Sequence, residues 1–367
     1  MGDAPRIGII GVGVISGIYL ETLTERPDIR VTAIADLDMT RAATVAAGIP
    51  GARALEVPAL LADPDVDVVL NLTIPAAHAD IALAAIANGK HVYGEKPLAV
   101  DFASGRRVMD AATAAGVRLG SAPDTVLGTG AQTARAVIDE GRIGRPIAAT
   151  AVMATAGPES WHPSPDFYFL PGGGPLMDMG PYYISALVHL LGPVTAVVGS
   201  ASRMRSERVI GSGPRAGVRI PVDVDTHVTG ILEHAGGALS TLTTSFDSVK
   251  SSAAPIEIHG ETGSLSVPDP NMFSGDVLFC PLGSREWEPV GDRAGYVDAA
   301  RGIGLLDMLA AATDAEVRAS GRLGLHTLEV MTAVLASAHA GARVELETTV
   351  ERPPLVPLGS SFDLTAL

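Results

Sequence analysis

Short apolar runs alternate with longer, alanine-rich segments through the first third of the chain. Most of the runs predict short strands, and Val66–Leu72 is apolar enough to lie buried on both faces of a sheet. The segments between the runs predict helices, among them Ile15–Thr24 and Asp101–Ala115. Strand–helix repeats of this length favour right-handed βαβ units, and they therefore predict a parallel, doubly wound sheet.

The pattern changes after about residue 125. Later segments such as Ile256–Gly260 and Gly263–Val267 have strand patterns and are joined by short turns, which is typical of an antiparallel sheet. Helical patterns return at Leu305–Arg318 and Leu323–Ala340. We therefore predict an α/β protein with a doubly wound domain over residues 1–125 and a mostly antiparallel domain over 126–367.

The composition excludes several function classes. The 367 residues carry a net charge of −15 at pH 7, whereas nucleic acids and anionic membranes are bound by clustered basic faces. Cys280 is the only cysteine, which excludes an intramolecular disulfide and fits a reducing cytoplasm. The nine histidines lack metal-ligand spacing, so we expect no metal. We recognise no signal peptide or membrane span, and expect a cytoplasmic protein without nucleic-acid or membrane partners.

A glycine-rich turn separates the first predicted strand from the first predicted helix. Gly11 permits a tight turn, and Gly13 lets the backbone approach a pyrophosphate. Val14 and Ile15 then open the helix, whose first N–H groups face the anion. The third small position is Ser16, whose hydroxyl is an additional candidate donor to phosphate.

An acidic residue follows at the end of the second predicted strand. Asp36 lies 23 residues after Gly13, close to the offset of ~20 expected for a carboxylate that binds the adenosine ribose. Such a carboxylate repels a 2′-phosphate, so it favours NAD over NADP, whereas Arg41 nearby suits that phosphate. A glycine turn beside a surface aspartate is the alternative explanation.

Lysine is rare in this chain and occurs only as Lys90, Lys96 and Lys250. Lys96 follows the fifth predicted strand, in the sequence Glu95-Lys96-Pro97, and ligands of doubly wound sheets bind outside the carboxyl ends of the strands. A lysine there can hydrogen-bond to substrate hydroxyls, and its charge favours alkoxide formation. A solvated loop lysine is the alternative.

A second segment with candidate catalytic side chains runs from Gly172 to Tyr183. Proline is tolerated in a helix only within the first turn, so Pro181 predicts a helix that begins near Asp178. Asp178 and Tyr182 then lie four residues apart on one helical face. Asp178 also suits the N-cap position, and that role alone would explain it.

These motifs together resemble the Gfo/Idh/MocA family of oxidoreductases. The resemblance rests on the glycine turn, on Asn71-Leu72-Thr73-Ile74-Pro75 with His78, on Gly89-Lys90-His91-Val92, on Glu95-Lys96-Pro97, and on a Gly-Gly-x-Leu-x-Asp-x-Gly-x-Tyr pattern that ends at Tyr182. It implies an N-terminal Rossmann domain and a C-terminal α/β domain with a large open sheet. It also implies NAD(P)-dependent redox chemistry on sugars, polyols or related diols, and a homodimer or homotetramer formed through the C-terminal sheet.

The resemblance also assigns residues by position. It implies that Thr73, Pro75 and His78 line the cofactor cleft, that Glu95 contacts the nicotinamide side and that Lys96 is catalytic. Many members have a histidine as acid/base where this chain has a tyrosine.

We hypothesise that the substrate hydroxyl donates its proton to Tyr182 while hydride leaves its carbon for C4 of the nicotinamide. Lys96 would stabilise the phenolate, and Asp178 would hold the hydroxyl or the lysine in place.

The loop before the glycines supplies one more substrate-binding candidate, His162. The chain has only 15 aromatic residues (7 Phe, 2 Trp and 6 Tyr), so few stacking surfaces are expected and a small polar ligand is easier to house. Two other functions found in the same family stay open. One is a glycosidase that uses NAD transiently, and the other is a non-catalytic regulator that binds NAD as a sensor.

Overall fold

The computed structural model describes residues 4–362 and 364, which form two compact units. The first unit combines the chain up to Leu127 with Asp298–Leu325 and the C-terminal residues from Gly359, and the second combines Gly128–Val297 with His326–Leu358. The predicted division at about 125 is close to the end of the first segment. The expected second domain over 126–367, however, contains two segments that fold with the first unit.

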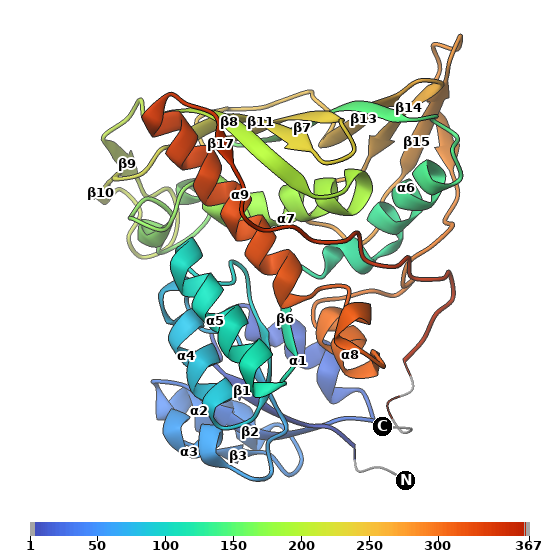
Figure 1. Ribbon diagram of the computed structural model, residues 1–367. Coiled ribbons are helices and arrows are strands. Elements are labelled where there is room, and N and C mark those ends of the chain that lie inside the picture. Colours follow the sequence, from blue (N-terminus) through green and yellow to red (C-terminus); the bar gives the residue numbers. More distant parts are fainter. Residues whose placement is uncertain (1–3, 363, 365–367) are drawn as a thin grey trace. The chain divides into compact units, whose positions relative to one another are not determined.

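The first unit is built on a parallel sheet of six strands in the order β3-β2-β1-β4-β5-β6 (Figure 1). The strand order reverses between β1 and β4, which is where ligands bind in doubly wound sheets. The strands are β1 (Arg6–Ile10), β2 (Arg30–Ala35), β3 (Arg53–Ala54), β4 (Val68–Asn71), β5 (His91–Gly94) and β6 (Leu119–Ser121). Strand β4 is buried at every position, as its apolar run predicts.

Helices follow most strands of this unit, and α4 and α5 lie side by side along it (Figure 1). The helices are α1 (Ser16–Thr24), α2 (Met39–Ala47), α3 (Val57–Ala62), α4 (Pro75–Ala87), α5 (Phe102–Ala115), α8 (Ile303–Ala310) and the start of α9 (Gly321–Ala340). Asp38 caps α2 through the N–H groups of Thr40 and Arg41, and Asp101 caps α5 through that of Ser104. Both starts follow the side-chain capping rule.

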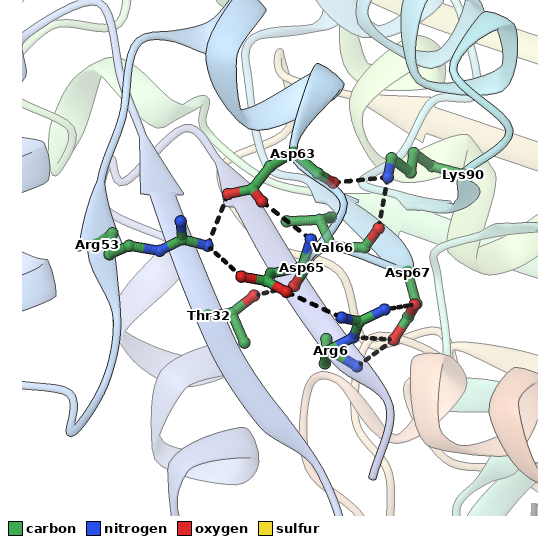
Figure 2. Close-up of polar contacts among 8 residues, drawn as sticks. All are labelled: Arg6, Thr32, Arg53, Asp63, Asp65, Val66, Asp67 and Lys90. Atoms are coloured by element: carbon green, nitrogen blue, oxygen red, sulfur yellow. Dashed lines mark hydrogen bonds and ion pairs between the residues drawn. The ribbon is translucent and has the colours of Figure 1, made fainter. Parts of the chain in front are cut away.

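An ion-pair network covers the amino ends of these strands (Figure 2). Arg6 at the start of β1 bridges Asp65 and Asp67, while Arg53 of β3 pairs with Asp63 and Asp65. Lys90 differs from the arginines because its Nζ donates to two backbone carbonyls, Asp63 O and Val66 O, each at 2.7 Å. Lys90 therefore fixes the turn that leads from α3 into β4, at the edge of the sheet opposite to the carboxyl ends of the strands.

The second unit contains a nine-stranded sheet in the order β16-β15-β14-β13-β7-β12-β11-β8-β17, and β9 and β10 form a separate hairpin. All neighbours in the large sheet are antiparallel except β7 and β12. The strands are β7 (Pro146–Ala154), β8 (Val194–Ser202), β9 (Glu207–Val209), β10 (Arg219–Pro221), β11 (His227–His234), β12 (Leu239–Ser245), β13 (Ile256–Gly260), β14 (Gly263–Val267), β15 (Val277–Pro281), β16 (Glu288–Val290) and β17 (Val344–Glu345).

Helices α6 (Thr129–Asp139), α7 (Pro175–Leu191) and the second part of α9 pack on this sheet (Figure 1). Gly199 of β8 and Gly230 of β11 are paired across the sheet, and a Cβ at either would press on Val334 of α9. Two glycines side by side therefore let α9 approach the sheet closely. Buried and more exposed positions alternate along β7, β11 and β12, so the opposite face of this sheet is open.

Candidate active site

The turn after β1 has the form expected of a dinucleotide site. Gly11 has a φ of +93°, and a Cβ at this position would lie 2.7 Å from Leu72 O, so only glycine closes the turn. A Cβ at Gly13 would meet no atom within 4 Å. Gly13 therefore leaves the outer face of the turn open, in the place where backbone would approach a pyrophosphate. The Ser16 hydroxyl donates instead to Gly13 O at 2.7 Å, so it stabilises the turn itself.

Asp36 ends β2 and is nearly buried, at 7% exposure. Its Oδ2 accepts from Val12 N–H at 2.8 Å, and its Oδ1 accepts from Asp38 N–H at 2.8 Å and from Arg41 Nη2 at 2.7 Å. Burial would raise the pKa of Asp36, but the bonds from Arg41 and the two N–H groups outweigh it and hold the pKa below its usual range. A carboxylate has about four acceptor positions, so about one stays open to a ribose hydroxyl.

Three apolar side chains are exposed at the turns after β1, β2 and β4. Val14 is 97% exposed, Leu37 99% and Ile74 70%. These turns are neighbours, because β2, β1 and β4 are adjacent and parallel. Exposed apolar side chains grouped in this way mark a ligand or partner surface. Val14 and Ile74 belong to the sequence motifs, whereas Leu37 has no sequence signal, because a single apolar residue in a turn matches no motif.

The turn after β4 is braced by polar contacts. The Thr73 hydroxyl donates to Asn71 Oδ1 at 2.7 Å, and Pro75 is the first residue of α4. His78 is 2% exposed, and its Nδ1 and Nε2 lie 2.7 Å from Pro97 O and 2.9 Å from Thr73 O. The His78 ring therefore joins the turn after β4 to the turn after β5 from within the protein, and it is Thr73 and Pro75 that lie nearer the surface.

Glu95 anchors the turn that carries Lys96. The Glu95 carboxylate is buried, its Oε1 accepts from the Tyr19 hydroxyl at 2.8 Å, and its Oε2 accepts from Lys96 N–H at 2.9 Å. Burial, followed by the charge of Glu95, raises the pKa of Tyr19 well above its ordinary value, so the phenol stays a donor. No sequence motif includes Tyr19. The structure therefore connects α1, which opens at the glycine turn, to the backbone of the candidate catalytic lysine.

A second buried carboxylate, Asp124, lies close to Glu95. Its Oδ2 accepts from Gly302 N–H at 2.8 Å and Gly304 N–H at 3.1 Å, at the start of α8, and Arg301 Nη1 lies 3.9 Å from Oδ1. Burial raises the pKa of Asp124 to about 6, against the opposing effect of Arg301 and the two N–H groups. Among the described residues, neither Asp124 Oδ1 nor the Tyr93 hydroxyl has a hydrogen-bond partner. Buried groups of this kind concentrate at functional sites.

The first unit therefore brings ten predicted residues to one edge of its sheet. They occupy the turns that follow β1, β2, β4 and β5, with His78 just inside: Gly11, Gly13, Val14, Ile15, Asp36, Thr73, Pro75, His78, Glu95 and Lys96.

In the second unit, α7 carries Asp178 and Tyr182 four residues apart. The expectation that this helix begins near Asp178 is wrong, because α7 begins at Pro175 with Gly174 as its N-cap. Pro181 lies inside the helix, where it removes a backbone hydrogen bond, yet almost every residue of α7 is buried and this packing offsets the loss. The N-cap explanation of Asp178 is thereby excluded.

His162 lies in the loop that leads into α7. Its Nδ1 accepts from Ser164 N–H at 3.1 Å, and its ring is partly exposed. The same loop reaches the start of α7, because Gly174 N–H donates to Tyr168 O at 2.7 Å. Within the second unit, the structure thus places His162 in a segment attached to the helix end that carries Asp178.

Two family models cover most of the chain. Residues 5–122 match the model described as the oxidoreductase family with an NAD-binding Rossmann fold, and residues 131–266 match that of the GFO/IDH/MocA C-terminal domain. A 1,5-anhydro-D-fructose reductase from Ensifer adhaerens is 31% identical over 268 residues, which are 71% of this chain and 74% of the relative. The chain belongs to the GFO/IDH/MocA family of NAD-binding oxidoreductases. This confirms the predicted family and its NAD cofactor.

Further relatives and solved structures agree with this family. Inositol 2-dehydrogenase 3 from Saccharopolyspora erythraea is 35% identical over 166 residues, 43% of this chain and 47% of that relative. An NAD-binding oxidoreductase from Klebsiella pneumoniae superposes with a TM-score of 0.79 at 24% identity, covering 93% of this chain and 98% of its own. A levoglucosan dehydrogenase in complex with NADH superposes with a TM-score of 0.77 at 22% identity, and the match covers 94% of this chain and 99% of the dehydrogenase. These likenesses confirm the predicted fold class.

The residues of the first unit fit the NAD of this family. The open face at Gly13 suits the pyrophosphate, and the free acceptor position of Asp36 suits the adenosine ribose. The exposed Val14, Leu37 and Ile74 offer apolar contacts to the flat rings of a dinucleotide. Among the described residues no group of three or more His, Cys, Asp or Glu side chains is placed to hold a metal ion, and no helix has the length and apolar character of a membrane span.

Proposed function

We propose that this protein is a cytoplasmic NAD-dependent dehydrogenase or reductase that acts on a hydroxyl or carbonyl carbon of a sugar, polyol or related diol. The observation that carries the proposal is the turn after β5, where a buried carboxylate, held at both oxygens, fixes the backbone of Lys96 at the edge of the sheet that fits NAD. A catalytic side chain requires a backbone held in such a fixed geometry. The relatives named as reductases and dehydrogenases of sugars and inositol support the substrate class.

Three side chains take the chemical roles in this proposal. Lys96 hydrogen-bonds to the reacting oxygen and stabilises negative charge on it. Tyr182, as a phenolate stabilised by Lys96, accepts the proton of the substrate hydroxyl during oxidation, and the resulting phenol returns it during reduction. Asp178, one turn before it on α7, orients that hydroxyl. Bound NAD supplies the hydride acceptor, or as NADH the donor.

A panel of sugars, cyclitols and open-chain polyols tests the proposal. Each compound is incubated with NAD and separately with NADP, and the absorbance of the reduced cofactor is followed. We expect NADH to form with at least one compound at a rate that saturates with its concentration. No reduced cofactor with any compound, together with aglycone release from a glycoside panel, would instead establish the glycosidase alternative. NAD binding with no turnover in either panel would favour the regulator.

We further propose that two copies associate through the open face of the large sheet. Three large apolar side chains there are exposed by 39–51%: Val198, Ile231 and Leu239. Val198 and Ile231 are directly paired on β8 and β11. Apolar side chains in such a row are typical of a protein–protein contact. Light scattering after size exclusion should give a dimer or tetramer mass, and Ile231→Lys should reduce it.

A further inference from the structure

Four aromatic rings gather in the loop between β7 and α7, in a chain with few aromatic residues. The His162 ring lies at the centre of the group, with its centroid 5.4 Å from Trp161, 5.5 Å from Phe167 and 5.6 Å from Tyr168, each edge to face. Phe167 and Tyr168 lie 4.0 Å apart. We call Trp161, His162, Phe167 and Tyr168 the aromatic platform. The composition predicts few stacking surfaces in this protein, and the aromatic platform is one of them.

The two largest apolar rings of the platform face solvent, since Trp161 is 64% and Phe167 51% exposed. Exposure of neighbouring large aromatic side chains costs free energy, and it commonly marks a binding surface. His162 adds a polar group among the rings. Because its Nδ1 accepts from Ser164 N–H, the neutral ring carries its proton on Nε2 and is a donor there.

The backbone beneath the platform is fixed by two ion pairs, one of them buried and the other at the surface. Glu159 pairs with Arg208 at 2.8 Å, and the Arg208 side chain is only 1% exposed. Asp166 pairs with Arg215 through two bonds of 2.6 and 2.8 Å, and this pairing lowers the pKa of Asp166. Phe169, fully buried, lies under the Arg208 guanidinium. Exposed rings on a fixed backbone lose little conformational entropy when they bind a ligand.

The platform is attached to the end of α7 that carries Asp178. Gly174, the N-cap, donates its N–H to Tyr168 O at 2.7 Å, and Asp178 N–H donates to Gly174 O at 3.0 Å. Gly173 has no room for a side chain, because a Cβ would lie 2.5 Å from Phe167 O and 2.6 Å from Tyr168 O. Platform and helix start therefore form one continuous, tightly packed structure within the second unit.

The chemistry of the platform selects for a ring. An aromatic face is electron-rich, and it attracts C–H groups whose carbon bears an oxygen. A pyranose or a cyclitol presents several such C–H groups on one flat face and its hydroxyls at the edge, where His162 Nε2–H can donate to them. An open-chain polyol has no persistent flat face. We propose that Trp161 and Phe167 stack against the ring of the substrate, so that the enzyme prefers cyclic sugars and cyclitols to open-chain polyols; this rests on the proposed function.

Intrinsic fluorescence tests the binding step without turnover. Trp161 and Trp287 are the only tryptophans, so Trp287→Phe leaves Trp161 as the sole reporter. The probes are 1,5-anhydro-D-glucitol, myo-inositol and D-glucitol, each added with NADH bound so that the alcohol does not react. Myo-inositol and D-glucitol carry the same number of hydroxyl groups and differ in ring closure. We expect a saturable change of Trp161 emission with a cyclic probe and none with D-glucitol.

Kinetic variants then separate the platform from the proposed activity. Trp161→Ala and Phe167→Ala should each raise KM for a cyclic substrate about tenfold, with kcat within about twofold of the wild type. Trp161→Phe keeps an aromatic ring and should retain most of the wild-type affinity. Trp287→Ala is the control and should leave KM and kcat unchanged. Normal turnover of a cyclic substrate by both alanine variants would overturn the platform and leave the proposed function standing. A saturable Trp161 response with no turnover of any compound would support the platform and overturn the proposed function. No response to any cyclic probe, or an equal response to D-glucitol, also overturns the platform.

Discussion

The Tyr19 hydroxyl donates to Glu95 Oε1 at 2.8 Å, while Glu95 Oε2 accepts from Lys96 N–H. One buried carboxylate thus connects a helix at the cofactor turn to the backbone of the candidate catalytic lysine. Neither contact is visible in the sequence, since 76 residues separate Tyr19 from Glu95.

Tyr19→Phe removes this donor and keeps the ring. A buried carboxylate that loses one partner costs about 1–3 kcal/mol of stability, and the looser turn should lower kcat about tenfold. Urea unfolding and steady-state rates measure the two effects. Tyr183→Phe is the matched control, because that hydroxyl lies 3.5 Å from Asp269 and contributes a much weaker bond. Equal effects in both variants would show that Tyr19 has no positioning role.

Lys96→Arg tests whether the lysine contributes more than a positive charge. The guanidinium is larger and holds its proton much more firmly than the ammonium. We expect kcat to fall by about 10²–10⁴ in Lys96→Arg and in Tyr182→Phe, with the Kd for NAD within a few fold of the wild type. Isothermal titration with NAD provides the binding control. Substantial turnover by either variant contradicts the roles proposed for these residues.

The pairing of Asp36 with Arg41 predicts how cofactor preference would change. Asp36→Ser removes the carboxylate that repels a 2′-phosphate, and it frees Arg41 to bind that group. The Kd for NADP should fall about tenfold and that for NAD should rise, and calorimetry measures both. Adding Arg41→Ala should abolish the gain for NADP. An unchanged ratio of the two Kd values would mean that neither side chain reads the ribose.

The raised pKa of Asp124 predicts a specific dependence of stability on pH. The folded protein retains the Asp124 proton up to about pH 6, whereas the unfolded chain releases it near its ordinary pKa of 3.8. Between these values the unfolded state binds fewer protons, so this group lowers stability as the pH rises, by about 3 kcal/mol in total. Asp124→Asn cannot titrate, and it keeps an acceptor for Gly302 and Gly304.

Urea unfolding at several pH values measures the free energy of unfolding of the wild type and of Asp124→Asn. As the pH rises from 4 to 6, the wild type should lose stability relative to the variant. Above pH 6 the difference between the two should stay constant. A difference that stays constant across the range would contradict the burial effect.

The sequence predicts the elements whose stability is local. The ends of β13 and β14 match the predicted ranges, because alternation and turn residues define them. The predicted helix Leu305–Arg318 is too long, since α8 ends at Ala310. At this helix end the Arg118 guanidinium donates to Met308 O and Leu309 O. Arg118 lies 190 residues from Met308 in the sequence, so no local pattern predicts this cap.

The residues of the candidate site also divide into those that local sequence patterns predict and those that they do not. Glycines, an acid after β2 and a Lys-Pro turn have fixed spacings, so a sequence reveals them. Tyr19 and the Asp124 contacts to α8 depend on segments that meet only in the folded protein. The exposure of Leu37 and Ile74 also has no sequence signal, because it is a property of the assembled sheet edge.

Lys90 and Lys250 are the two lysines to which no catalytic role is assigned. Their substitution tests whether Lys90 contributes to stability alone. Lys90 Nζ donates to Asp63 O and Val66 O, so Lys90→Met leaves two partly buried carbonyls without these bonds (Figure 2). Its stability should fall by about 1–3 kcal/mol while kcat stays within about twofold. Lys250 is exposed, and Lys250→Met should change stability by less than about 0.5 kcal/mol. A large loss of kcat in Lys90→Met, at a temperature where it is folded, would place Lys90 in the catalytic machinery instead.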